Sequence, residues 1–117
     1  MKNCQIIATL MSALSEMSAA LEAFKAGGVG GKGLFRSEEA WARWYVAGDR
    51  LVSARSKVDS AQRRLEDPYW VDCPDARQTL FELDARMATM ALESARSLLQ
   101  DGEAPVRRAM TMALLGA

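Results

Sequence analysis

Apolar residues recur along the first part of the chain at alternating steps of three and four. The seam consists of Ile7, Leu10, Leu14, Met17, Leu21 and Phe24. This heptad spacing places all its members on one face of a helix, and no β-strand can present it. We therefore predict a first helix over residues 2–26, ended by the glycines that begin at Gly27.

A second seam runs without proline from Ser37 to about Glu66 and predicts a helix over residues 37–66. Ser37 is a good N-cap, and the two acidic residues that follow it suit the positive end of the helix dipole. The apolar positions are Trp44, Ala47, Leu51, Ala54, Val58, Ala61 and Leu65. The alternation of alanine with larger side chains predicts close packing against a neighbouring helix, which would also account for Gly48 inside this helix.

The dipeptide Asp67-Pro68 separates this helix from a third one, predicted over residues 74–100 with Pro74 in its first turn. The expected seam of the third helix is Ala76, Leu80, Leu83, Met87 and Met90, extended by Leu98. Gly102 ends the helix, and Pro105 lies at the start of a short fourth helix over residues 104–115. The apolar residues that share one face of this predicted helix are Val106, Ala109, Met110 and Ala113.

No segment alternates between apolar and polar residues as a strand does. We expect one all-α domain over residues 1–117, an antiparallel bundle of three long helices plus a short C-terminal helix. Five glycines lie between Gly27 and Gly33. They exceed what a tight turn needs, so residues 27–35 are expected to form a flexible loop.

That loop contains the stretch AGGVGGKG, which partly matches a phosphate-binding loop. Ala26, Gly31 and Lys32 are in register, but Gly33 stands where the metal-binding hydroxyl belongs. A helix rather than a strand precedes the glycines, so we expect no nucleotide site here.

Composition excludes several classes of function. The chain has 15 basic and 15 acidic residues and no histidine. It therefore lacks the usual general base and the commonest zinc ligand, and we expect no enzyme activity, metal or cofactor. Zero net charge gives no general attraction to nucleic acid or to a membrane.

The cysteines and the N-terminal residues bear on the cellular compartment. Cys4 and Cys73 are isolated thiols, which suit a reduced, cytoplasmic protein. Residues 1–15 faintly resemble a secretory signal, but their helical register continues past Glu16 to Phe24. No apolar stretch is expected to reach the ~18 residues of a membrane span.

Basic residues recur every seven positions from the loop to the end of the second helix. This basic stripe is Arg36, Arg43, Arg50, Lys57 and Arg64. One interpretation pairs it with acidic residues on and around the third helix, namely Asp72, Asp75, Glu82, Asp84, Glu93 and Asp101. The other interpretation is a contact surface for an acidic protein or a phosphate backbone.

Aromatic residues gather at two places. In the stretch WARWY, Trp44 lies on the seam, while Trp41 and Tyr45 share another face and are either core residues or exposed anchors of an interface. In the link DPYWVD, Tyr69 and Trp70 either close the end of the bundle or form a recognition loop.

These features favour a non-catalytic helical protein that binds a larger protein, as a small adaptor or a stoichiometric inhibitor. The candidate partner-binding residues are Arg36, Trp41, Arg43, Tyr45, Arg50, Lys57 and Arg64, with Tyr69 and Trp70 as loop candidates. Small size and the lack of motifs are typical of proteins that phages and mobile elements direct against a host, CRISPR inhibitors included. Two alternatives stay open: a nucleic-acid-binding protein that uses the basic stripe, which zero net charge disfavours, and a structural homodimer formed through the second helix.

Overall fold

The computed structural model describes residues 2–100, which form three long helices and two short 3₁₀ turns. The helices are α1 (Asn3–Gly28), α2 (Glu38–Glu66) and α3 (Pro74–Gln100), and the turns are η1 (Gly31–Gly33) and η2 (Pro68–Trp70). Residues 2–100 contain no strand, which confirms the predicted all-α fold. The fourth helix predicted over residues 104–115 lies outside the described residues.

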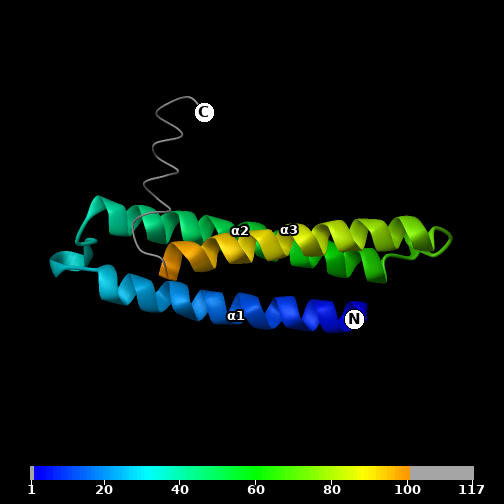
Figure 1. The fold of residues 1–117 in the computed structure, drawn as a ribbon, viewed down its shortest axis with the longest axis horizontal. Coiled ribbons are helices and arrows are strands. Elements are labelled where there is room, and N and C mark those ends of the chain that lie inside the picture. Colours follow the sequence, from blue (N-terminus) through cyan, green and yellow to red (C-terminus); the bar gives the residue numbers. More distant parts are fainter. Residues whose placement is uncertain (1, 101–117) are drawn as a thin grey trace, which may run out of the picture.

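The three helices lie side by side, and each runs opposite to the one before it (Figure 1). Helices α2 and α3 pack against each other along most of their length, while α1 lies along one side of this pair with fewer contacts. The helix boundaries lie within two residues of those predicted, and the largest difference is the end of α1 at Gly28.

Alanines form the centre of the contact between α2 and α3. Ala47, Ala54 and Ala61 on α2 are completely buried, as are Phe81, Ala88 and Ala95 on α3. Both sets repeat every seven residues, and all of these positions except Phe81 are alanines, so small side chains recur along most of the contact. This arrangement agrees with the close packing predicted from the alternation of alanine with larger residues in the second seam.

The buried face of α3 differs from the predicted one. Leu83, Met87 and Met90 are 48%, 41% and 63% exposed, and Ala76 is exposed as well. Leu98, the predicted extension of the seam, is buried as expected, but the other buried positions are Phe81, Asp84, Ala85, Ala88, Leu92 and Ala95. The rest of the predicted seam was wrong because apolar residues cover a wide arc of α3, and the helix turns its alanines rather than its methionines toward α2.

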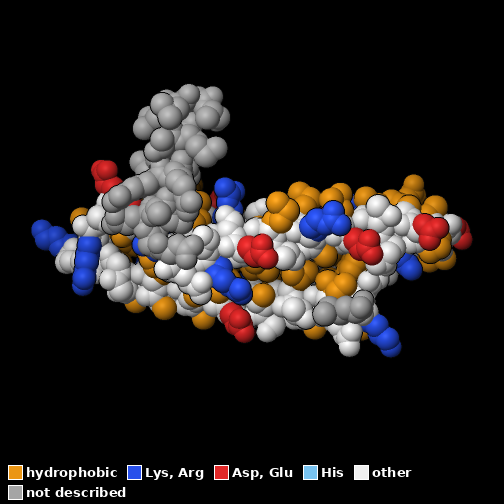
Figure 2. All heavy atoms as spheres, in the orientation of Figure 1, with side chains coloured by type: hydrophobic (Ala, Val, Ile, Leu, Met, Phe, Trp, Pro, Cys, Tyr) orange, Lys and Arg blue, Asp and Glu red, His pale blue; other side chains and the backbone are white. Residues whose placement is uncertain are grey.

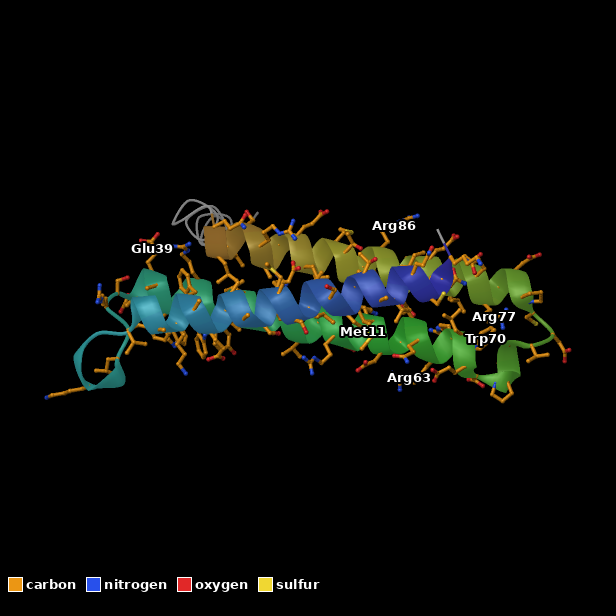
Figure 3. The ribbon with its side chains drawn as sticks, turned by 90° about the horizontal axis from the view of Figure 1, so that it is seen from below. Met11, Glu39, Arg63, Trp70, Arg77 and Arg86 are labelled. Carbon is orange, nitrogen blue, oxygen red and sulfur yellow. The ribbon has the colours of Figure 1, made fainter. Side chains whose placement is uncertain are left out.

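Helix α1 buries the first four residues of its predicted seam, Ile7, Leu10, Leu14 and Met17, while Leu21 and Phe24 are half-buried. Near its start, the side-chain amides of Asn3 and Gln78 exchange two hydrogen bonds of 2.8 and 3.2 Å, which join α1 to α3. Met11 of α1, labelled in Figure 3, is 52% exposed.

Contrary to the expectation that no apolar stretch is long enough, α1 meets the length and hydropathy of a membrane span. The mean hydropathy of its best 18-residue window is 1.3, and 17% of that window is buried. Core helices and N-terminal signal sequences meet the same criterion, so this property leaves the compartment open.

Gly48 does not lie at a tight helix contact as expected. A Cβ atom added there would stand 3.6 Å from Leu21 Cδ2, an ordinary van der Waals distance. The structure therefore gives no packing reason for glycine at this position, and its cost to the helix is uncompensated.

Main-chain hydrogen bonds close the glycine-rich loop between α1 and α2. The Gly30 N–H donates to Leu34 O over 2.6 Å, and the Arg36 N–H donates to Gly28 O over 2.8 Å. Lys32 and Gly33 have φ angles of 64° and 73°, the left-handed region that glycine tolerates best. The predicted flexibility of residues 27–35 stays a prediction, but the chain reversal that the glycines allow is present.

Candidate interaction surface

The start of α2 is held in place by a cap and by aromatic packing. The Ala40 N–H donates to Ser37 Oγ over 3.1 Å, the N-cap bond that the sequence predicts. Trp44 packs against Phe35 at 5.4 Å between ring centroids, and the Lys25 ammonium lies 5.0 Å from the Trp44 ring. Trp44 thus joins the end of α1, the loop and α2.

Trp41 and Tyr45 lie on the exposed side of the same turns of α2. Their rings stack at 5.2 Å between centroids with an interplanar angle of 26°. They remain 49% and 58% exposed, and Leu34 in the adjoining loop is 69% exposed. A stacked pair on a capped helix is preorganised, because little side-chain entropy is left to lose on binding.

An open hollow of about 460 Å³ lies beside this pair. Its lining residues are Lys25, Gly33, Leu34, Phe35, Ser37, Glu38, Trp41 and Trp44. The wall is mainly aromatic and aliphatic, with one cation and one carboxylate. Such a lining suits an apolar side chain that carries a polar group at its edge. We call Leu34, Trp41, Tyr45 and this hollow the aromatic surface.

Two members of the basic stripe serve the fold. Arg43 Nε donates to Leu98 O over 2.9 Å, and its guanidinium lies 4.7 Å from the Phe24 ring. Arg64 Nε lies 3.5 Å from Asp84 Oδ2, and Asp84 is 5% exposed. The interpretation in which the stripe pairs with acidic residues of the third helix therefore holds for Arg64.

The other three members differ in their surroundings. Arg36 and Arg50 are exposed, and Lys57 is half-buried. None of the three makes a hydrogen bond or ion pair through its side chain with another residue of the described part of the chain. The stripe is thus not one continuous free surface, because two of its five cations are engaged by neighbouring helices.

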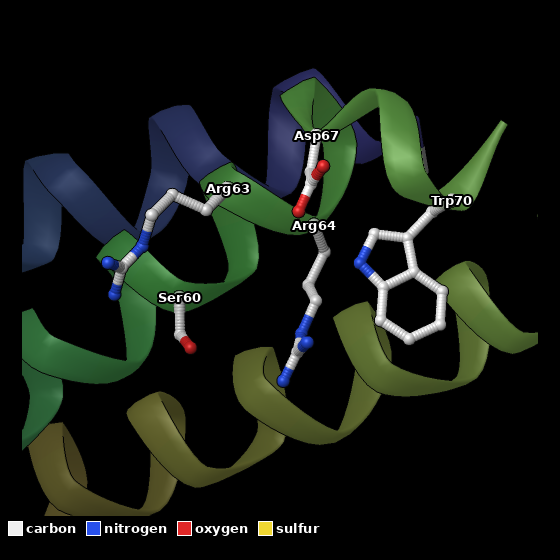
Figure 4. Close-up of a pocket in the computed structure, with 5 residues that line it drawn as sticks. All are labelled: Ser60, Arg63, Arg64, Asp67 and Trp70. Carbon is white, nitrogen blue, oxygen red and sulfur yellow. The ribbon is translucent and has the colours of Figure 1, made fainter.

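The link between α2 and α3 places its two aromatic residues differently. The Tyr69 N–H donates to Asp67 Oδ1 over 2.9 Å, and the Arg64 guanidinium lies 5.6 Å from the Trp70 ring. Figure 4 shows Arg64 and Trp70 both extending toward α3, beside a hollow of about 190 Å³. Trp70 is half-buried and closes this end of the bundle, whereas Tyr69 is 76% exposed and projects from it.

Sequence reasoning did not single out Leu34, and it assigned the exposed apolar residues of α3 to the core. The signal for Leu34 was its place in the loop between the glycines and the N-cap of α2, because connecting loops run over the surface of a protein. Residues 2–100 hold no group of three or more Cys, Asp or Glu side chains placed to bind a metal ion, and Cys4 and Cys73 are exposed free thiols.

No protein-family model matches this chain, and neither a curated protein nor a solved structure shows significant similarity to it.

Proposed function

We propose that this protein is a non-catalytic helical interaction protein, a small adaptor or stoichiometric inhibitor that binds a larger protein through the aromatic surface. The observation that carries the proposal is the stacked, half-exposed pair of Trp41 and Tyr45 beside an open apolar hollow. Tryptophan, tyrosine and arginine are the residues that dominate binding energy at protein interfaces. An exposed aromatic pair has no stabilising role in the fold comparable to that of Trp44.

Electrostatics adds a preference to this surface. Lys25 lies at the hollow and Arg36 is exposed in the loop that borders it, while Glu38 is the acidic residue of the lining. A partner that inserts an aliphatic or aromatic side chain, with a carboxylate near its base, suits both the apolar wall and the adjacent cations. The bundle, with residues 104–115 as its predicted fourth helix, is the rigid support in this proposal.

The test is affinity capture with matched aromatic variants. We expect wild type and Tyr69→Ala to retain the same partner from an extract of the source cells or their host, and Trp41→Ala/Tyr45→Ala to lose it. Tyr69 is a suitable control because it is equally aromatic and more exposed, but lies at the opposite end of α2. The captured partner is then purified, and its dissociation constant is measured for each variant.

Loss of one such ring is expected to weaken binding about 30-fold, since hot-spot aromatics each contribute about 2 kcal/mol, and loss of both rings by up to about 900-fold when the two contributions add. Unchanged affinity for Trp41→Ala/Tyr45→Ala would contradict the proposal. Far-UV circular dichroism of each variant checks that the helices remain intact.

The nucleic-acid alternative receives less support from the geometry, because Arg43 and Arg64 are engaged by α1, α3 and η2. It predicts a gel shift at low salt that weakens steeply as salt rises. The phage-borne, CRISPR-inhibitor-like role suggested by chain length stays a prediction that identification of the captured partner will test.

A further inference from the structure

The outer side of α3 carries an apolar stripe that the rest of residues 2–100 leaves partly exposed. Leu83, Met87 and Met90 are exposed, and half-buried Leu80 continues the stripe toward the start of the helix. In Figure 2, hydrophobic side chains gather along the upper edge of the right half of the molecule, where α3 lies in Figure 1, on the side away from α1. The steps of three, four and three make this a heptad seam, the pattern by which one helix packs along another.

Two charged residues border the stripe on its side away from α2. Arg86 and Glu93 are exposed, and neither makes a hydrogen bond or ion pair through its side chain with any residue in the range 2–100. They lie one residue before Met87 and three residues after Met90, the heptad positions that flank a coiled-coil seam. In Figure 3, Arg86 extends from α3 away from the other two helices.

The stripe and its two charged residues match a second copy of α3 that runs in the opposite direction. When two identical helices pack antiparallel, a residue of one helix faces a residue of the other, and the two residue numbers of each facing pair add up to the same total. Aligning Met87 with Met90 of a second α3 also aligns Leu83 with Ser94, a half-buried side chain small enough to leave room for a leucine. The same alignment brings Arg86 next to Glu93, so opposite charges meet beside the methionines. A two-fold axis repeats each of these contacts.

The charges distinguish this alignment from the neighbouring one along the heptad. Shifting the second helix by one heptad aligns Leu83 with Met87, and it then places the two copies of Arg86 opposite each other at the two-fold axis. That shift gains apolar contact but sets like charges together, which is destabilising at flanking heptad positions. The attraction between Arg86 and Glu93 therefore favours the alignment centred between Met87 and Met90.

We propose that α3 binds the α3 of a second copy of this chain, antiparallel and two-fold symmetric about a point between Met87 and Met90. Met87 packs against Met90 of the partner subunit, and Arg86 pairs with Glu93 of the partner subunit, each contact occurring twice. The charge pattern selects this occupant, because an unrelated helix has no reason to require opposite charges placed symmetrically about this point.

This surface differs from the homodimer contact predicted from the second seam. The α2 seam residues Ala47, Leu51, Ala54, Val58 and Ala61 are already buried within one chain. The central part of the proposed contact runs from Leu83 to Ser94, or about 16 Å of helix. A contact of this length belongs to the small, weak class of interfaces, so we expect a dissociation constant on the order of 50 μM.

The dimer does not depend on the proposed function. Leu34, Trp41 and Tyr45 lie on α2 and the loop before it, and the proposed contact uses none of them. Failure of partner capture therefore leaves the dimer untouched, and a monomeric protein leaves the aromatic surface available.

Sedimentation equilibrium of the full-length chain from about 1 μM to about 1 mM tests the proposal. We expect monomer at the lowest and mainly dimer at the highest concentration, with Met90→Lys remaining monomeric throughout. Met11→Lys is the matched control, because Met11 is a methionine on α1 that is 52% exposed, and it should dimerise like wild type. All substituted side chains are exposed, and circular dichroism verifies that each variant is folded.

Charge reversal tests the antiparallel geometry itself. Arg86→Glu and Glu93→Arg should each weaken the dimer about tenfold, because two attractive contacts become two repulsive ones. The double variant Arg86→Glu/Glu93→Arg should restore wild-type affinity. In the shifted alignment, by contrast, reversing Arg86 only exchanges one pair of like charges for another, so an affinity unchanged by Arg86→Glu would overturn the proposed geometry.

Three other results would each overturn the proposal. The first is a wild-type protein that is still monomeric at the highest concentration. The second is a dissociation constant of the dimer that Met90→Lys does not change. The third is a double variant that dimerises no more tightly than either single variant.

Discussion

Replacing Phe81 by alanine should destabilise the protein far more than replacing Met90 by alanine. The sequence pattern suggests the reverse, since Met90 belongs to the heptad seam of α3 and Phe81 lies beside it. In the structure Phe81 is 0% exposed and Met90 is 63% exposed. The difference between the two losses of stability therefore shows which face of α3 packs against α2.

The magnitudes follow from these exposures. A phenylalanine side chain buries about 150–250 Å², worth about 4–6 kcal/mol as an upper bound at ~25 cal/mol per Å². Truncation at a buried site leaves a cavity, and such Phe→Ala changes cost about 3–5 kcal/mol. Met90 removes only about a third of its surface from water, so its loss should cost about 0.5–1 kcal/mol without creating a cavity.

Urea denaturation followed by circular dichroism measures both costs. The protein is kept at about 1 μM, below the expected dissociation constant of the α3 dimer, so that only the intrachain role of Met90 is observed. A difference of about 2–4 kcal/mol is expected, equivalent to roughly 10–25 °C in Tm for a domain of this size. Equal costs for the two variants, or a larger cost for Met90→Ala, would show that the described face of α3 is not the packed one.

Three further substitutions test local features of the fold by the same assay. Ser37→Ala removes the cap bond to the Ala40 N–H and should cost about 1 kcal/mol; no change would mean that the bond contributes nothing in solution. Gly48→Ala should stabilise by up to ~1 kcal/mol, because the added Cβ meets only Leu21 Cδ2 at 3.6 Å, and a loss of stability would reveal a tight contact there. Arg64→Met leaves the Asp84 carboxylate buried and unpaired and should cost about 1–3 kcal/mol, while Arg64→Met/Asp84→Leu should recover most of that loss. A double variant as unstable as the single one would argue against an unpaired charge as the cause.

The helices could be predicted from sequence because their start and stop signals are local. Ser37 caps α2 through a hydrogen bond to a residue three positions away. Asp67-Pro68 ends α2 for local reasons that do not depend on the packing of the helices. The seams of α1 and α2 were also predictable, since each helix has a single apolar arc of ordinary width.

The buried face of α3 could not be settled in this way. Two arcs of this helix are apolar, and the choice between them depends on how closely α2 approaches. Alanine repeats on both helices hold the relevant information, at Ala47, Ala54 and Ala61 and at Ala88 and Ala95. This information becomes usable only when the two helices are considered as a pair, because small residues are favoured where backbones come close.

The candidate site was predictable in part for a related reason. The i, i+4 spacing of Trp41 and Tyr45 indicates a shared face, but only tertiary packing shows that this face is open while that of Trp44 is covered. Heptad spacing likewise aligned Arg43 and Arg64 with the other basic residues. The contacts of Arg43 with Leu98 O and of Arg64 with Asp84 depend on the position of α3. The spacing of residues within α2 carries no information about that position.

Site-specific photocrosslinking tests the central claim most directly. A benzophenone amino acid is placed at position 45 or at position 69, and each purified protein is irradiated in an extract of the source cells or their host. The proposed interaction surface predicts a discrete heavier adduct from position 45, suppressed by excess wild-type protein, and none from position 69. The proposal would be contradicted if position 45 gave no adduct. It would also be contradicted if only position 69 gave an adduct that excess wild-type protein suppresses.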